Sequence, residues 1–167
     1  ASPAPVMVPP PGAKPPADDA LDAMRTRLLP LSTLLTPNIP EAELLLGTAI
    51  ASAADADAAI EALRALGARA VLLKGGHLDE GDEVVDRYAD DALRSRFVHD
   101  RLQVDGHGTG CTLASAIAAA LCQGLTLHEA VDVASDYINA ALLTGYQPGR
   151  GDVLVLGHLQ ALQHEEA

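Results

Sequence analysis

The sequence predicts an α/β fold: a mostly parallel sheet flanked by helices, with a β-hairpin toward one edge. Apolar strand-like segments and amphipathic helical segments alternate along the chain, which is typical of α/β layering. The run Ala70-Val71-Leu72-Leu73 is apolar without a break, as in strands buried on both faces of a parallel sheet. A glycine-rich turn at 106–110 leads from a strand-like segment into an Ala-rich helix.

The bulk composition predicts one domain, covering 1–167, with an aliphatic core. The 167 residues are 49% hydrophobic but 2% aromatic, so Leu, Val, Ile and Ala must fill the interior. The formal net charge of -12 argues against nucleic acids and anionic membranes as partners. No apolar run reaches the roughly 18 residues of a membrane span, and no signal peptide is visible, so we expect a cytoplasmic protein.

The first half of the chain predicts strands and helices in alternation. Short apolar runs indicate strands at 6–8, at 31–36 and at 70–73. Helical spacing of apolar residues predicts helices over 18–29, 41–46 and 52–66. Typical start and stop residues flank these helices: Asp18 or Asp19, Ser52 with Asp55, Gly47 and Gly67.

The second half predicts a hairpin and then two helices. Strand-like runs at 83–88 and 93–98 flank Asp90-Asp91, as expected for antiparallel strands near a sheet edge. A helix is predicted over 112–122, and Thr126-x-x-Glu129 is a capping box that opens another, which ends before Gly145. A last strand is expected at 153–156, and the tail from His158 is expected to fray.

The stretch Gly106-His107-Gly108-Thr109-Gly110-Cys111-Thr112 is the strongest candidate for a functional site. Glycines let the chain turn tightly with no Cβ in the way of a ligand. The first N–H groups of the following helix have no intrahelical partner, and the helix dipole adds partial positive charge. Phosphate is the expected guest. A tight turn without a ligand explains these glycines equally well.

The two cysteines differ in their expected roles. Cys111 falls at or near the first helical turn, a position that stabilises a thiolate, so it could act as a base; a small buried residue is the alternative. Cys122 is expected to be buried and inert. On one helix the two would lie roughly 16 Å apart at 1.5 Å per residue, too far for a disulfide. Free thiols fit a reducing cytoplasm.

Three more residues follow predicted strands and could bind phosphate or metal. Lys74 ends a buried strand, where ligands of open α/β sheets bind, although a solvated lysine is the alternative. Asn38 and Glu41 could hold a hydrated Mg²⁺, but from these residues alone an N-cap arrangement is the preferred interpretation. His107, His128 and His158 show no metal-ligand spacing, so a zinc site is not expected, and His77 has no evident partner and is expected at the surface.

Together these strand ends predict a site for a nucleoside triphosphate, Mg²⁺ and phosphoryl transfer. The chain has no Gly-x-x-x-x-Gly-Lys-Ser/Thr loop, which argues against a Walker-type site, and it has no protein-kinase motif set.

The chain resembles the ribokinase-like superfamily, and within it the hydroxymethylpyrimidine/phosphomethylpyrimidine kinases of thiamine synthesis. The resemblance runs from about Pro5 to about His158, and its last two motifs are the most specific. The motifs that carry it are Pro5-Val6-Met7-Val8, Leu28-Leu29-Pro30-Leu31, Thr36-Pro37-Asn38-Ile39-Pro40-Glu41-Ala42, Val71-Leu72-Leu73-Lys74-Gly75-Gly76-His77 and His107-Gly108-Thr109-Gly110-Cys111-Thr112-Leu113.

The resemblance implies transfer of the ATP γ-phosphate to hydroxymethylpyrimidine and then to its monophosphate. Cys111 would be the catalytic base, where many ribokinase relatives carry aspartate. Gly108, Thr109 and Gly110 would form the anion hole, and Lys74 would contact nucleotide phosphate. Asn38 and Glu41 match the family's Asn-x-x-Glu motif for Mg²⁺ and phosphate.

The chain departs from the family at its front, where the family's glycine-rich substrate-binding segment has no counterpart. Ala4 replaces the usual Asp, and Pro9 to Gly12 replace a polar turn. We therefore expect the C-terminal part of the family's chain, and a homo-oligomer or a complementing chain to cover apolar sheet surface. The alternatives are a pyridoxal or hydroxyethylthiazole kinase of the same superfamily, or a truncated, inactive nucleotide-binding module.

Overall fold

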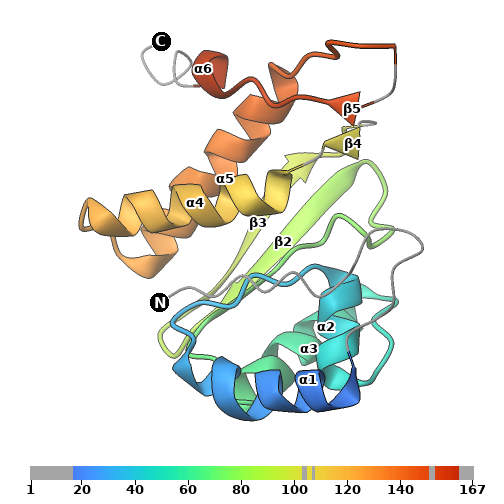
Figure 1. The fold of residues 1–167 in the computed structure, drawn as a ribbon, viewed down its shortest axis with the longest axis vertical. Coiled ribbons are helices and arrows are strands. Elements are labelled where there is room, and N and C mark those ends of the chain that lie inside the picture. The colour runs from blue at the N-terminus through green and yellow to red at the C-terminus, as the bar shows by residue number, and fades with distance from the viewer. Residues whose placement is uncertain (1–16, 103–104, 107, 151–152, 162–167) are drawn as a thin grey trace. The chain divides into compact units, whose positions relative to one another are not determined.

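A computed structural model describes residues 17–102, 105–106, 108–150 and 153–161 (Figure 1). The strand expected at 6–8 lies outside this range, as does His107. The chain divides into two compact units, Ala1–Arg101 and Leu102–Ala167.

The first unit contains a three-stranded sheet with the order β1-β2-β3, formed by β1 (Val71–Leu73), β2 (Glu83–Ala89) and β3 (Arg94–Asp100). Both pairings are antiparallel, and Asp86 faces Phe97 across the hairpin. The predicted hairpin and its place at a sheet edge are therefore confirmed. The expectation of a mostly parallel sheet is not confirmed for the described residues, because parallel pairing is confined to a few residues beside β1 and to one two-stranded pair.

The helices of the first unit lie where the sequence predicts them, but the first helical segment changes its geometry along its length. It begins as α1 (Asp18–Ala23), widens into a π-helical turn η1 (Met24–Leu28) and tightens into the 3-10 turn η2 (Leu29–Leu31). Ala17 rather than an aspartate is its N-cap. Leu31 belongs to η2, and the strand expected at 31–36 is reduced to an isolated bridge at Leu35, with a second bridge beyond that range at Asn38.

Two further helices, α2 (Ile39–Leu46) and α3 (Ala53–Ala65), belong to this unit, and both have the predicted caps. The Ser52 hydroxyl accepts from the Asp55 amide, and Gly47 ends α2 in the left-handed conformation. The helices gather on one side of the sheet (Figure 1). The core between them consists of Leu29, Leu35, Ile39, Ala42, Leu45, Ile50, Ala56, Ala59, Ile60, Leu63, Ala68, Val71, Leu73, Leu78 and Ala89.

Charged side chains connect α3 to the hairpin and to the loop before it. Arg87 is buried on β2, and its guanidinium donates to both carboxylate oxygens of Glu80. It also lies 3.3 Å from the Asp57 carboxylate of α3, which pairs with Arg96 of β3 at 3.0 Å. The hydrogen bonds from Arg87 hold the pKa of the Glu80 carboxyl below its usual value. The loop between β1 and β2 is thus fastened to the sheet by a buried cation.

The second unit pairs two helices with a short parallel sheet. Its elements are β4 (Asp105–Gly106), α4 (Thr109–Cys122), α5 (Leu127–Leu143), β5 (Val153–Leu154) and α6 (His158–Ala161). The helices α4 and α5 pack against each other, and β4 pairs with β5. The capping box of Thr126 and Glu129 forms as predicted. The last strand is shorter than expected, and residues 158–161 form a helix rather than a frayed tail.

We expect Glu80→Gln to lower the free energy of unfolding at pH 7 by roughly 1–3 kcal/mol, because it removes a charged partner from buried Arg87. Since folding lowers the pKa of Glu80 from its ordinary value of 4.5, its contribution is present above that pH. It is lost as the pH falls through the folded-state pKa. Urea unfolding at pH 7 and near pH 3 measures both effects.

The exposed Glu83, whose substitution by Gln should leave stability almost unchanged, serves as the control. A difference between wild type and Glu80→Gln that stays constant down to pH 3 would contradict this account.

Candidate active site

In the first unit Asn38 and Lys74 lie side by side. Residues 35–38 run parallel to β1, with one bridge between Leu35 and Val71 and another between Asn38 and Lys74. The Lys74 amide donates to the Pro37 carbonyl at 2.9 Å, and the Leu72 amide donates to the Leu35 carbonyl at 2.8 Å. Two residues that the sequence puts at separate strand ends are thus neighbours through their backbones.

Asn38 and Glu41 form a complete capping box at the start of α2. The Asn38 side-chain oxygen accepts from the Glu41 amide at 2.9 Å, and Glu41 Oε2 accepts from the Asn38 amide at 2.9 Å. The capping interpretation preferred from these residues alone therefore describes the local geometry. The second carboxylate oxygen, Oε1, makes no hydrogen bond to any described residue. Glu41 therefore caps the start of α2 and also presents a half-buried carboxylate there.

Lys74 is half-buried and is followed by a turn that only glycine fits. A Cβ on Gly75 would lie 2.1 Å from the Val85 carbonyl oxygen, whereas a Cβ on Gly76 would meet nothing within 4 Å. The Gly75 amide donates to Asp86 Oδ1 at 2.7 Å. Lys74 forms no ion pair with any described residue.

Arg101 binds backbone carbonyls of the loop between β1 and β2. Its guanidinium donates to the carbonyl oxygens of Gly76, Leu78, Gly81 and Glu83, at 3.0, 2.6, 3.1 and 3.1 Å. The loop between β1 and β2 is therefore held by side chains from β2 and from the residue after β3. This role of Arg101 was not predicted from the sequence, because nothing local distinguishes an arginine that binds backbone carbonyls from a solvated one.

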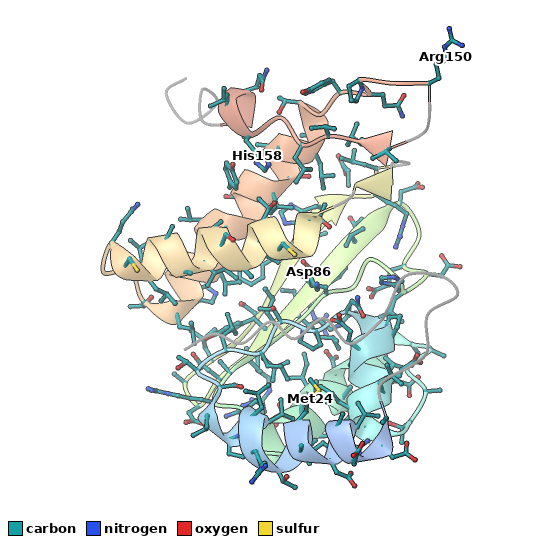
Figure 2. All side chains as sticks on the ribbon, in the orientation of Figure 1. Met24, Asp86, Arg150 and His158 are labelled. Carbon is teal, nitrogen blue, oxygen red and sulfur yellow. The ribbon has the colours of Figure 1, made fainter. Side chains whose placement is uncertain are left out.

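Asp86, labelled on β2 in Figure 2, is a second residue that the sequence-based prediction did not include. Burial raises the pKa of the Asp86 carboxyl, while the hydrogen bond from Gly75 and the positive charges of His99, Lys74 and Arg87 oppose that effect. Nothing in the sequence singles out Asp86, because Glu83 and Arg87 of the same strand are also charged.

In the second unit the glycine-rich turn ends at the open start of α4. Gly108 is the N-cap in the left-handed conformation, with φ 85°, and it contributes no side-chain hydrogen bond. Thr109, Gly110 and Cys111 are the first three helical residues, and the first bond back to the N-cap is from the Thr112 amide to the Gly108 carbonyl, at 2.9 Å. Side chains cap α2, α3 and α5, but no side chain among the described residues caps the amides at the start of α4.

Both cysteines lie on α4, and both are free and exposed. Cys111 is in the first turn, as expected, with its thiol exposed. The expectation that Cys122 is buried is wrong: it is the last residue of the helix, beyond the face that packs through Leu113, Ile117 and Ala120.

The described histidines do not form a metal site. His77 is exposed, His128 is half-buried, and His158 bonds through Nδ1 to the Tyr137 hydroxyl at 3.0 Å. Among the residues with a described placement, no three His, Cys, Asp or Glu side chains are grouped so that they could bind a metal ion.

In the described part of the chain, none of the helices has the length and hydropathy that crossing a membrane requires.

The fold is shared with small-molecule kinases. The structure of the pyridoxal kinase from Staphylococcus aureus, in complex with AMP-PCP, is 32% identical in sequence with a TM-score of 0.83, covering 94% of this chain and 57% of that one. The chain therefore has an α/β fold similar to that of the ribokinase-like kinases.

The family is shown by sequence. Residues 3–156 match the family described as phosphomethylpyrimidine kinase, and the chain belongs to that family. The thiamine biosynthesis bifunctional protein ThiED of Geobacter sulfurreducens is 49% identical over 148 residues, 88% of this chain and 30% of the relative. The hydroxymethylpyrimidine/phosphomethylpyrimidine kinase of Mycobacterium bovis is 46% identical over 136 residues, 81% of this chain and 50% of the relative. The chain thus spans half or less of these curated relatives' length.

We expect Gly75→Ala to destabilise the first unit by roughly 1–3 kcal/mol, because its methyl group would overlap the Val85 carbonyl. Gly76→Ala is the matched control, since its methyl group meets open space. Thermal unfolding of the two variants measures the difference. Equal melting temperatures would contradict the close approach of the turn to β2.

Proposed function

We propose that this chain carries the phosphate-binding part of an ATP-dependent kinase that phosphorylates hydroxymethylpyrimidine and then its monophosphate in thiamine biosynthesis. The observation that carries the proposal is the uncapped start of α4 with Cys111 in its first turn, in a chain of the phosphomethylpyrimidine kinase family. In this proposal residues 1–167 belong to a single ribokinase-like domain, whose complete sheet is mostly parallel.

Gly108, Thr109 and Gly110 provide the anion hole for the transferred phosphoryl group. The first amides of α4 face no intrahelical acceptor, and the helix dipole adds positive charge at the same end. Donors fixed before the reaction stabilise the charge that spreads over the phosphoryl oxygens in the transition state. The absence of a side-chain cap on α4 supports this role, because a capping oxygen would occupy one of these amides.

Cys111 acts as the catalytic base. As the substrate hydroxyl oxygen bonds to the γ-phosphorus, its proton passes to the thiolate sulfur of Cys111. The bond from the γ-phosphorus to the bridging oxygen breaks, and ADP leaves with that electron pair. Exposure of the Cys111 thiol in the first turn of α4 supports this assignment.

Lys74 contacts the nucleotide phosphates. Its ammonium forms no ion pair with the described residues, and its backbone is fixed on one side by Pro37 and on the other by the Gly75 turn. A lysine held in this way presents a point charge to phosphate oxygens.

Asn38 and Glu41 fit a Mg²⁺ ion that is held mainly through water and phosphate. Mg²⁺ takes one or two carboxylates together with substrate phosphates rather than a cage made only of protein. Glu41 Oε1 is the oxygen not used by the capping box, and the backbone bridge keeps this carboxylate near Lys74. The ion would supply positive charge to the phosphates of ATP.

A pyridoxal kinase is the second candidate, and the likeness to the Staphylococcus aureus enzyme favours it. A hydroxyethylthiazole kinase and an inactive nucleotide-binding module are the remaining candidates. The names of the curated relatives favour the pyrimidine substrate.

A cytoplasmic location and a homo-oligomer or complementing chain stay predictions, and sedimentation analysis of the purified protein tests the oligomeric state.

We expect the purified protein to bind MgATP and to phosphorylate hydroxymethylpyrimidine faster than pyridoxal or hydroxyethylthiazole. Calorimetry measures nucleotide binding, and parallel turnover assays compare the three alcohols. A preference for pyridoxal would replace the pyrimidine substrate, and nucleotide binding without any turnover would favour the inactive module. No nucleotide binding at any Mg²⁺ concentration would remove the mechanism.

We expect Cys111→Ala to lower kcat by about 100-fold or more while the affinity for ATP stays unchanged, because a base acts in the chemical step. Cys122→Ala, which alters the other exposed thiol of the same helix, is the control and should retain wild-type turnover. Unchanged turnover in Cys111→Ala would show that this thiol is not the base.

A further inference from the structure

Asp86 receives a hydrogen bond at the point where β1 leaves the sheet. The β1–β2 pairing ends with Leu73 opposite Arg87, and continuing it by one residue sets Lys74 opposite Asp86. The chain does not continue as a strand there. Instead, the Gly75 amide donates to Asp86 Oδ1 at 2.7 Å (Asp86 is labelled in Figure 2). A side-chain carboxylate thus accepts the bond that a backbone carbonyl would accept in a regular ladder.

We propose that Asp86 is a positioning residue for Lys74: by holding the Gly75 amide, it fixes the direction in which the Lys74 side chain leaves the sheet toward nucleotide phosphate. The inference rests on the function proposed above and adds a residue to its site. Asp86 itself would touch neither ATP nor the pyrimidine.

The backbone on both sides of Lys74 is fixed, which is what a positioning role requires. Its own amide is bonded to the Pro37 carbonyl at 2.9 Å, and the next amide is bonded to Asp86. The close approach of Gly75 to the Val85 carbonyl leaves the turn no room to shift toward β2. With both flanking amides held, the Lys74 Cα–Cβ bond has a single direction, and only the side-chain torsions remain free.

The charges around Asp86 indicate that it positions Lys74 rather than neutralising the Lys74 ammonium. Lys74 and Asp86 would face each other if the β1–β2 pairing continued by one residue, and facing residues of an antiparallel pair lie close together. Nevertheless, no ion pair joins them, so the ammonium of Lys74 is not committed to this carboxylate. Asp86 bonds to the backbone next to Lys74 and leaves the positive charge available for phosphate.

A double-mutant cycle separates this role from a purely structural one. We would measure the binding of Mg²⁺ and AMP-PCP by calorimetry for wild type, Asp86→Ala, Lys74→Ala and the double variant, using the concentration of folded protein. If Asp86 acts through Lys74, Asp86→Ala weakens nucleotide binding about tenfold in the wild-type background. It then causes no further loss when Lys74 is already alanine.

Conservative substitution gives a second readout. Asp86→Asn retains an oxygen that can accept from Gly75, and we expect its nucleotide affinity to stay within about threefold of wild type. Asp86→Ser, whose hydroxyl is one bond shorter, should resemble Asp86→Ala, and it replaces that variant in the cycle should the alanine protein fail to fold.

Asp90→Ala is the matched control. Asp90 follows β2 at the far end of the same hairpin, and its Oδ1 accepts from the Ala92 and Leu93 amides at 2.8 and 2.9 Å. Its loss should lower the melting temperature without changing nucleotide affinity.

Three outcomes would overturn the inference while the proposed function stands: unchanged binding in Asp86→Ala, an equal loss in both Lys74 backgrounds, or Asp86→Asn as weak as Asp86→Ala. A wild-type protein that binds no nucleotide would overturn the proposed function and this inference with it.

Discussion

The backbone pairing between residues 35–38 and β1 is the interaction on which the first unit's site depends. It joins two segments that are separated in sequence by α2 and α3, and it does so through amide and carbonyl groups of the main chain. Because α2 starts directly after Asn38, the same pairing fixes where that helix begins. The cap of one helix and the lysine at the end of a strand become neighbours as a consequence of sheet formation, and the carboxylate of Glu41 follows from the cap.

Features with local causes could be predicted from the sequence. The hairpin around Asp90 follows from two strand-like runs and a short polar turn, and the capping boxes at Asn38 and Thr126 follow from a three-residue spacing. The stops at Gly47 and Gly67 follow from the left-handed conformation that glycine adopts readily. The features that were predicted wrongly depend on the tertiary environment. The widening of the first helix at Met24–Leu28 has no signature in local propensity, and the extent of the parallel pairing depends on which segments meet.

The residues of the candidate site also divide into those with local sequence signals and those that depend on tertiary contacts. The start of α4 at Gly108 to Cys111 could be found from the order of glycines and the helix that follows. Asp86 and Arg101 could not, because each binds backbone groups far away in sequence, and such contacts exist only after the sheet has formed. The exposure of Cys122 was also beyond prediction, since it depends on how far the packed face of α4 extends.

The left-handed glycine at the start of α4 has a consequence for engineering. At most helix starts a polar side chain is a gain, and an asparagine, which tolerates the left-handed region, would find open space at position 108. Its amide oxygen would then bond to the N–H groups that the proposed function assigns to phosphate. Under the proposed function, a substitution chosen to make the protein more heat-resistant would therefore place a side chain in competition with the phosphate of the substrate.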